Sequence, residues 1–213
     1  MTCKAFLISI GIKNLYKNFK LYNGYLKETG WNHSVKQTSS VDKFGEAIPW
    51  FTYPCFRFLN TRLKKDLKIF EFGSGNSTLW FSKNSQKVFS VEHDKEWFEK
   101  LKIDLSNRGN VDYVHRTLTN GDYKNEILEY ENFFDIIIID GRDRVNCIFN
   151  SLGALKKSGV IILDNSDRDR YLEAISFLEE KGFRSIDFWG IGPMNHEEWC
   201  TSIFYRSGNC LGI

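Results

Sequence analysis

The sequence has little of what marks several common classes of protein. It holds only three prolines, so no proline-rich linker divides its 213 residues. Its five cysteines are an odd number and include no C-x-x-C pair. This pattern argues against a disulfide scaffold or a zinc ribbon and favours reduced thiols in a cytoplasmic protein. The net charge of +2 gives no electrostatic reason to expect a nucleic acid as the partner.

What is present is the composition of an ordinary globular domain, 42% hydrophobic and 26% charged. We expect an N-terminal helical and irregular extension over residues 1–44 and one domain over residues 45–213. The apolar run at 5–12 is too short to span a bilayer, and we interpret it as part of a helix rather than a signal peptide. Three lysines follow within residues 13–20. We expect this basic helix to pack on its own domain or on a second subunit, with peripheral membrane contact as the alternative.

From residue 68 onward, strand-like and helix-like segments alternate. The runs DIIIID (135–140) and VIILD (160–164) are continuously apolar, which predicts strands buried on both faces. The alternation predicts an α/β fold with a Rossmann-like, doubly wound, seven-stranded and mostly parallel sheet. We expect a helix over 143–159 that a glycine closes. No helix separates the last two strands, so the last one should run antiparallel.

The stretch IFEFGSGNSTLW (69–80) carries the first candidate binding residues. Gly73 and Gly75 permit a tight turn and let a ligand approach the backbone. Asn76, Ser77 or Thr78 can cap the helix that follows. The next predicted strand ends in Glu92, where a carboxylate suits the two hydroxyls of a ribose. In doubly wound sheets ligands bind at the carboxyl ends of the strands, so a nucleoside-bearing cofactor is expected there.

Two cofactors compete for this site. A dinucleotide site has the pattern G-x-G-x-x-G, and Thr78 stands here at the third glycine position. Glu71 lies two residues before Gly73, where a carboxylate would repel a pyrophosphate and attract a cation. S-adenosylmethionine carries an ammonium and a sulfonium. The chemistry therefore favours S-adenosylmethionine over NAD.

Four motifs in order carry a family resemblance: EFGSGNST, SVEHD, FDIIIIDG and VIILDN. Over residues 45–206 they resemble the motif series of the class I S-adenosylmethionine-dependent methyltransferases. The chain is also similar to a bacterial group of uncharacterised methyltransferase-like proteins, through IPWFTYP before the core and WCTSIFYR after it. That second likeness supplies no substrate. The resemblance implies that Glu71 and the glycine loop hold the methionine end, that Glu92 binds the ribose, and that His93 or Asp94 lines the adenine pocket. The implied cofactor-binding residues are Glu71, Gly73, Ser74, Gly75, Asn76, Ser77, Glu92, His93 and Asp140.

A second set of polar residues follows the fourth and fifth predicted strands. Asp140, Asp164 and Asn165 offer three oxygen ligands at one edge, which suit Mg²⁺ or Ca²⁺. Such an ion would lower the pKa of a bound hydroxyl. The arrangement resembles the catechol O-methyltransferase type, although Arg142 and Asp143 stand near Asp140 where that type has a lysine base. The alternative is that all three are turn and helix-cap residues.

The candidate catalytic residues are Asp140, Asp164 and His196. Four arginines near the same edge could clamp an acidic acceptor or form salt bridges with neighbouring aspartates: Arg142, Arg144, Arg168 and Arg170. Aromatic residues in the flanking segments suit a sugar or a ring: Trp50, Tyr53, Trp189 and Trp199. We therefore expect a methyltransferase that acts at oxygen on a small molecule or glycan precursor. The alternatives are a nucleotide-dependent oxidoreductase and a non-catalytic scaffold, and the oligomeric state is left open.

Overall fold

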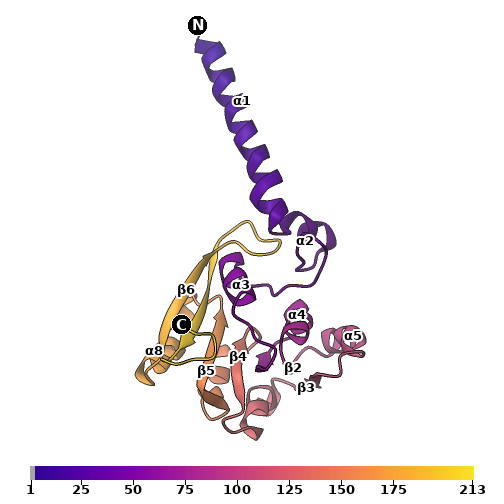
Figure 1. The fold of residues 1–213 in the computed structure, drawn as a ribbon, viewed down its shortest axis with the longest axis vertical. Helices are drawn as coiled ribbons and strands as arrows, with labels where there is room; N and C mark the ends of the chain where they lie inside the picture. The colour runs from indigo at the N-terminus through magenta and orange to yellow at the C-terminus, as the bar shows by residue number, and fades with distance from the viewer. Residues whose placement is uncertain (1–2) are drawn as a thin grey trace.

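The computed structural model describes residues 3–213, and their side chains from residue 11 onward. A single seven-stranded sheet forms the centre of the described chain (Figure 1). Its strands are β1 (Lys68–Phe72), β2 (Lys87–Glu92), β3 (Val111–His115), β4 (Phe134–Ile139), β5 (Leu155–Asp164), β6 (Arg184–Gly190) and β7 (Trp199–Tyr205). The strand order is β3-β2-β1-β4-β5-β7-β6, and only β7 runs antiparallel to its neighbours. The predicted Rossmann-like sheet with an antiparallel last strand is confirmed.

Helices cover both faces of this sheet. The α-helices are α1 (Cys3–Leu21), α2 (Trp31–Gln37), α3 (Tyr53–Asn60), α4 (Asn76–Asn84), α5 (Lys95–Leu105), α6 (Asp122–Asn125), α7 (Arg144–Ser151) and α8 (Leu172–Glu180). A π-helical turn, η1 (Tyr22–Leu26), extends α1, and three 3₁₀ turns are η2 (Thr119–Gly121), η3 (Glu126–Glu129) and η4 (Asp169–Tyr171). Residues of α3 and α4 pack on one face of the sheet, and residues of α6, α7 and α8 pack on the other.

The apolar runs of the sequence produce this two-sided burial. All six residues of β4 are buried, and alternate side chains enter opposite cores. Ile136 and Ile138 pack with the α3 and α4 side, whereas Ile137 and Ile139 pack with the α7 and α8 side. A strand that fills two cores needs no polar face, which explains the four consecutive isoleucines of β4.

The prediction of a helix over 143–159 is wrong in its second half. The helix α7 ends at Ser151, and β5 begins at Leu155 after a turn. Leu155 pairs with Phe134 of β4, and the Lys156 amine donates to the Asp135 carboxylate at 2.9 Å. Sheet pairing and this ion pair therefore hold the segment extended, although its sequence also suits a helix.

The N-terminal helix α1 stands away from the sheet domain (Figure 1). Ile12, Leu15 and Phe19 are 63%, 70% and 62% exposed. The expectation that this helix packs on its own domain is therefore wrong for its described side chains, and packing on a second subunit stays a prediction. Among residues 3–213, no helix has both the length and the apolar character needed to cross a membrane.

Candidate functional site

A cavity of about 620 Å³ opens at the carboxyl ends of β1, β4 and β5. Strand order reverses at this place, because β1 lies between β2 and β4, and ligands bind at such switch points. The turn into α4 contributes Ser74, Gly75, Asn76 and Ser77 to the wall, and β4 and β5 contribute Asp140 and Asp164. The structure therefore brings residues from both predicted sets into one cavity.

The two glycines of the first turn have different roles. Gly73 has a φ of +91°, and a Cβ there would lie 3.0 Å from the Cα of Gly141. Gly73 thus permits close backbone packing between the turns that follow β1 and β4. Gly75 has extended backbone, and a Cβ there would meet no protein atom within 4 Å. Gly75 therefore leaves its backbone bare towards the cavity, as the sequence predicted for ligand approach.

Glu71 lies beneath this turn. It is buried, and its Oε2 accepts hydrogen bonds from the Thr78 hydroxyl at 2.5 Å and the Ser90 hydroxyl at 3.2 Å. The Thr78 hydroxyl in turn accepts the Gly75 N–H at 3.1 Å. Burial raises the pKa of Glu71 to about 7, against the lowering effect of its hydroxyl partners. Within the described chain, Glu71 and Gly73 are not in the cavity wall, so both support the turn from behind.

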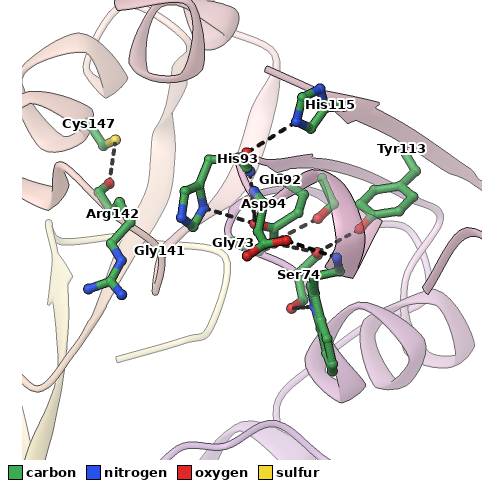
Figure 2. A network of polar contacts seen from close by, with 12 residues as sticks. Gly73, Ser74, Glu92, His93, Asp94, Tyr113, His115, Gly141, Arg142 and Cys147 are labelled. Carbon is green, nitrogen blue, oxygen red and sulfur yellow. Dashed lines mark hydrogen bonds and ion pairs between the residues drawn. The ribbon is translucent and has the colours of Figure 1, made fainter. Parts of the chain in front are cut away.

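Glu92 is the centre of a second polar network (Figure 2). Its Oε1 accepts the backbone N–H groups of His93 and Asp94, at 2.8 and 2.9 Å. Its Oε2 accepts the Ser74 hydroxyl at 2.7 Å, and Ser74 also contacts the Tyr113 hydroxyl at 2.9 Å. Glu92 is buried, and among the described residues Ser74, rather than Glu92, lines the cavity. The Ser74 hydroxyl therefore stands between the carboxylate and the cavity.

Of the residues that follow Glu92, His93 and Asp94 lie outside the cavity wall, whereas Trp97 is part of it. Asp94 caps α5 by accepting the Trp97 N–H at 3.0 Å. The Trp97 indole donates to the main-chain oxygen of Ser74 at 2.9 Å and lines the cavity. His93 is half-buried and packs edge-on against Tyr123, outside the cavity wall. The sequence analysis missed Trp97. Its position in the first turn of α5, three residues after the N-cap Asp94, was the signal that could have placed it near the ends of the strands and the glycine turn.

Arg144 joins the ends of β4 and β5. Its Nη2 donates to Oδ1 of Asp140 at 3.0 Å, and its Nε donates to the main-chain oxygen of Gly141 at 2.9 Å. Its Nη1 donates to the main-chain oxygen of Asp164 and, at 3.4 Å, to Oδ1 of Asn165. Arg144 itself is buried. The fork of donors on one guanidinium therefore fixes the β4 and β5 end of the cavity.

Asp164 is oriented from the other side by β7. Its Oδ1 accepts the Trp199 indole N–H at 2.9 Å and the Thr201 hydroxyl at 2.6 Å. Burial raises the pKa of Asp164, against these two hydrogen bonds. Burial and the nearby Asp164 carboxylate also raise the pKa of Asp140 well above its usual range, although Arg144 opposes this. Two carboxyl groups of raised basicity therefore face one cavity.

The predicted Mg²⁺ or Ca²⁺ site does not fit this geometry. Arg144 bonds to the Asp140 carboxylate, the Asn165 side-chain oxygen and the main-chain oxygen of Asp164, and its positive charge would repel a divalent cation beside it. In the part of the chain that the structure describes, no group of three His, Cys, Asp or Glu side chains could hold a metal ion. The metal hypothesis is therefore not supported, because the Arg144 guanidinium already supplies the positive charge beside Asp140.

Several other candidates lie outside the cavity. The His196 side chain is 87% exposed and not in the cavity wall, so the geometry does not support it as a catalytic base. Of the four predicted arginines, Arg168 lines the cavity. Of the four aromatic residues, Trp50 and Trp199 do so.

The N-terminal segment supplies part of the wall that sequence reasoning missed. Thr38, Ser39 and Ser40 line the cavity, although the expected domain boundary lay after them. The Asn76 amide donates to the Ser39 hydroxyl at 2.9 Å and to the main-chain oxygen of Ser40 at 2.6 Å. These contacts join positions more than 35 residues apart, and no local pattern announces them.

Asn195 ties the opposite rim to the same segment. Its side-chain oxygen accepts the Trp50 indole N–H at 2.9 Å, and its main-chain oxygen accepts the Trp31 indole N–H at 2.8 Å. The helix α2, which the polar sequence did not suggest, is held in place by this Trp31 contact. The loop between β6 and β7 and the N-terminal segment therefore form one roof.

Comparison with known proteins identifies the fold. The sequence matches no protein-family model and no curated protein. The structure is similar to precorrin-6Y C5,15-methyltransferase from Geobacter metallireducens, with a TM-score of 0.58 and 19% identity over 72% of this chain and 87% of that one. It is similar to an rRNA methylase from Streptococcus thermophilus, with a TM-score of 0.55 and 17% identity over 71% and 96%. It also resembles Aeropyrum pernix fibrillarin with natively bound S-adenosyl-L-methionine, with a TM-score of 0.54 and 14% identity over 67% and 68%.

These neighbours differ in what their names say they act on, and they share one architecture. The chain therefore has the fold of the class I S-adenosylmethionine-dependent methyltransferases, as its ordered strand-end motifs predicted. At identities below 20% the likeness establishes the fold alone. What the protein does has to be inferred from the cavity.

Proposed function

We propose that the protein is an S-adenosylmethionine-dependent methyltransferase. The observation that carries this proposal is a cavity at the switch point of the sheet, with the bare backbone of Gly75 in its wall and two oriented carboxyl groups opposite. The main enzymatic alternative is a nucleotide-dependent oxidoreductase. A dinucleotide fold has the parallel order 3-2-1-4-5-6, whereas β7 enters this sheet antiparallel between β5 and β6.

The residues at the β1 end fit a cationic nucleoside cofactor. Ser74, Gly75 and Trp97 would contact it directly, offering a hydroxyl, open backbone and an aromatic face. Glu71 and Glu92 would act from behind these residues, through Thr78 and Ser74, as sources of negative charge. When bound, S-adenosylmethionine supplies a methyl group activated by its sulfonium.

The residues at the β5 end suit proton removal from an acceptor hydroxyl. Thr201 and Trp199 fix Oδ1 of Asp164, and the raised pKa makes this carboxylate a stronger base than an ordinary aspartate. Asp164 would accept the hydroxyl proton as the acceptor oxygen is methylated. Arg144 keeps Asp140 and Asp164 in place without a metal, so transfer should not need Mg²⁺.

The cavity rim favours a small acceptor over a nucleic acid. Asp167, Glu197 and Glu198 line it together with Asp140 and Asp164, and among the described residues Arg168 is the one basic side chain in the wall. Such a rim would repel a phosphate backbone. Trp50 and Trp199 offer apolar ring faces beside these carboxylates, which suits a polyhydroxylated ring. The acceptor is therefore a small molecule or glycan precursor.

Two further aspects complete the proposal. The protein works in the cytoplasm, in keeping with the free thiols of Cys55, Cys147, Cys200 and Cys210. A non-catalytic scaffold is the remaining alternative. Such a scaffold has no need for an open cofactor cavity or for an oriented, basic carboxylate, and both are present here.

A labelling experiment tests the proposed function. The full chain would be incubated with methyl-labelled S-adenosylmethionine and, separately, with a small-molecule extract, total RNA and total protein. We expect label in the small-molecule fraction, retained in the presence of a chelator. Label in RNA would overturn the acceptor class, and loss of transfer in chelator would overturn the metal-free mechanism. The absence of label in every fraction, despite bound cofactor, would favour the scaffold.

A further inference from the structure

The helix α1 presents a continuous apolar face to solvent. Ile12, Leu15, Tyr16 and Phe19 follow the spacing i, i+3, i+4 and i+7, which places them on one side of a helix. All four are more than half exposed. Figure 1 shows the helix extending away from the sheet domain. The described domain therefore covers none of this face.

Lysines occupy the neighbouring face of the same helix. Lys13, Lys17 and Lys20 follow the spacing i, i+4 and i+7, offset by one residue from the apolar positions. The Lys20 amine lies 5.2 Å from the centre of the Tyr16 ring, so the basic and aromatic side chains adjoin. All three lysines are exposed.

The charge of this region differs in sign from that of the rest of the chain. Residues 1–27 contain five lysines and no acidic residue. The remaining 24 basic and 27 acidic residues lie from Glu28 onward, which gives that part a net charge of −3. A near-neutral total therefore conceals a purely cationic N-terminal region.

We propose that α1 docks the protein on a membrane surface that contains anionic phospholipids. The apolar face would enter the boundary between headgroups and acyl chains, and the lysines would contact lipid phosphates. The apolar run at residues 5–12 gives about 12 Å of helix, against about 30 Å of hydrocarbon, so the helix lies along the surface. Packing of two α1 helices from two copies would instead bring cationic faces together with no acid to pair them.

A vesicle flotation experiment with the full chain tests this proposal. Vesicles of phosphatidylcholine alone would be compared with vesicles that also contain phosphatidylglycerol. We expect binding to the anionic vesicles at low salt, and about tenfold less binding to the neutral ones. Lys13→Glu, Lys17→Glu and Lys20→Glu combined should reduce the bound fraction to the level of neutral vesicles. Leu15→Asp combined with Phe19→Asp should also reduce it.

A matched control is available on α5. Lys95, Lys100 and Lys102 are exposed on a helix of the domain, so their combined change to glutamate alters net charge equally. This control should keep vesicle binding, whereas an equal loss would mean that total charge, not α1, governs it. No binding to anionic vesicles, with sedimentation showing a dimer that the α1 variants dissociate, would overturn the proposal in favour of a second copy. Neither outcome depends on methyl transfer, so failure here leaves the proposed function standing.

Discussion

The two ends of the cavity use similar carboxyl groups with opposite partners. At the β1 and β2 end, Glu71 and Glu92 accept hydrogen bonds from hydroxyl and backbone N–H groups, which carry no net charge. At the β4 and β5 end, Asp140 and the chain at Asp164 share the Arg144 guanidinium. Uncharged donors hold a carboxylate and leave its negative charge, whereas a guanidinium cancels it. The β1 and β2 end can therefore attract a cationic cofactor, and the β4 and β5 end can hold the methyl acceptor without a metal ion.

The largest expected effect comes from removing the proposed base. Asp164→Asn should lower kcat about 10²- to 10⁴-fold, because it keeps the shape of the side chain and removes its basicity. The dissociation constant for S-adenosylhomocysteine should change little, since Asp164 belongs to the acceptor end. Kinetics with the acceptor from the labelling experiment and calorimetry would measure the two quantities. Asp169→Asn, at an exposed position outside the cavity wall, is the matched control. Unimpaired turnover in Asp164→Asn would transfer the role of base to Asp140.

Arg144→Met should produce the largest loss of stability. It leaves the half-buried Asp140 carboxylate without its ion-pair partner and removes the cation nearest the buried Asp164 carboxylate, which costs roughly 3–5 kcal/mol in the free energy of unfolding. Urea titration would measure this, and addition of Asp140→Asn should restore part of the loss. Arg168→Met, on an exposed arginine of the same cavity, should stay within about 0.5 kcal/mol of the parent protein. Equal stability of both variants would mean that Arg144 does not neutralise the carboxyl groups at the β4 and β5 end, and would contradict the contrast with the β1 and β2 end.

Glu71 should make stability depend on pH. Its folded pKa of about 7 lies above the ordinary value of 4.5, so between these values the folded state binds the proton that the unfolded state has lost. Stability should therefore fall as pH rises from 4.5 to 7, by about 3 kcal/mol in total. Glu71→Gln should abolish this loss, as urea titrations at several pH values would show. A bound cation favours the ionised carboxylate, so cofactor affinity should rise over the same range. Identical pH profiles for the two proteins would contradict the raised pKa.

The smallest effects are expected from alanine substitutions at Gly73 and Gly75, of which the first should lower stability and the second should lower cofactor affinity. Gly73→Ala places a Cβ at positive φ against Gly141, which should cost about 1–2 kcal/mol of stability. Gly75→Ala meets no protein atom, so its stability should stay within about 0.5 kcal/mol while cofactor affinity falls. Urea titration and calorimetry on the same two variants would show this. Loss of stability in Gly75→Ala with unchanged affinity would mean that the cofactor does not approach this backbone.

The fold could be predicted well from the sequence, because the local pattern of apolar residues shows which strands are buried. The four consecutive isoleucines of β4, at 136–139, fill two cores, and the missing helix before β7 predicted its reversed direction. The start of β5 was missed because Leu155 and Lys156 are held by partners on β4, which no window of neighbouring residues contains. Local pattern therefore determines which strands exist, and pairing determines where they begin.

Apart from Trp50 and Trp199, the cavity was predictable where its residues lie at or just after strand ends. Gly75, Asp140 and Asp164 were found because parallel strands bring their carboxyl ends to one edge. Ser39 and Ser40 reach the cavity through bonds to Asn76, across a sequence separation that carries no signal. Asp140 and Arg144 are four residues apart, a spacing that allows the ion pair seen in the structure. The sequence could not single out this pair, because other aspartates lie equally near the arginines.

Calorimetric titration of the protein with S-adenosylhomocysteine and with NAD⁺ tests the central claim most directly. Negative charge beneath the glycine turn and a bare Gly75 backbone predict micromolar binding of S-adenosylhomocysteine, weakened by Gly75→Ala and insensitive to chelator. They predict no measurable binding of NAD⁺, because Glu71 and Glu92 place negative charge directly behind the residues that its pyrophosphate would contact. Tight binding of NAD⁺ with no signal from S-adenosylhomocysteine would contradict the assignment of this cavity to methyl transfer.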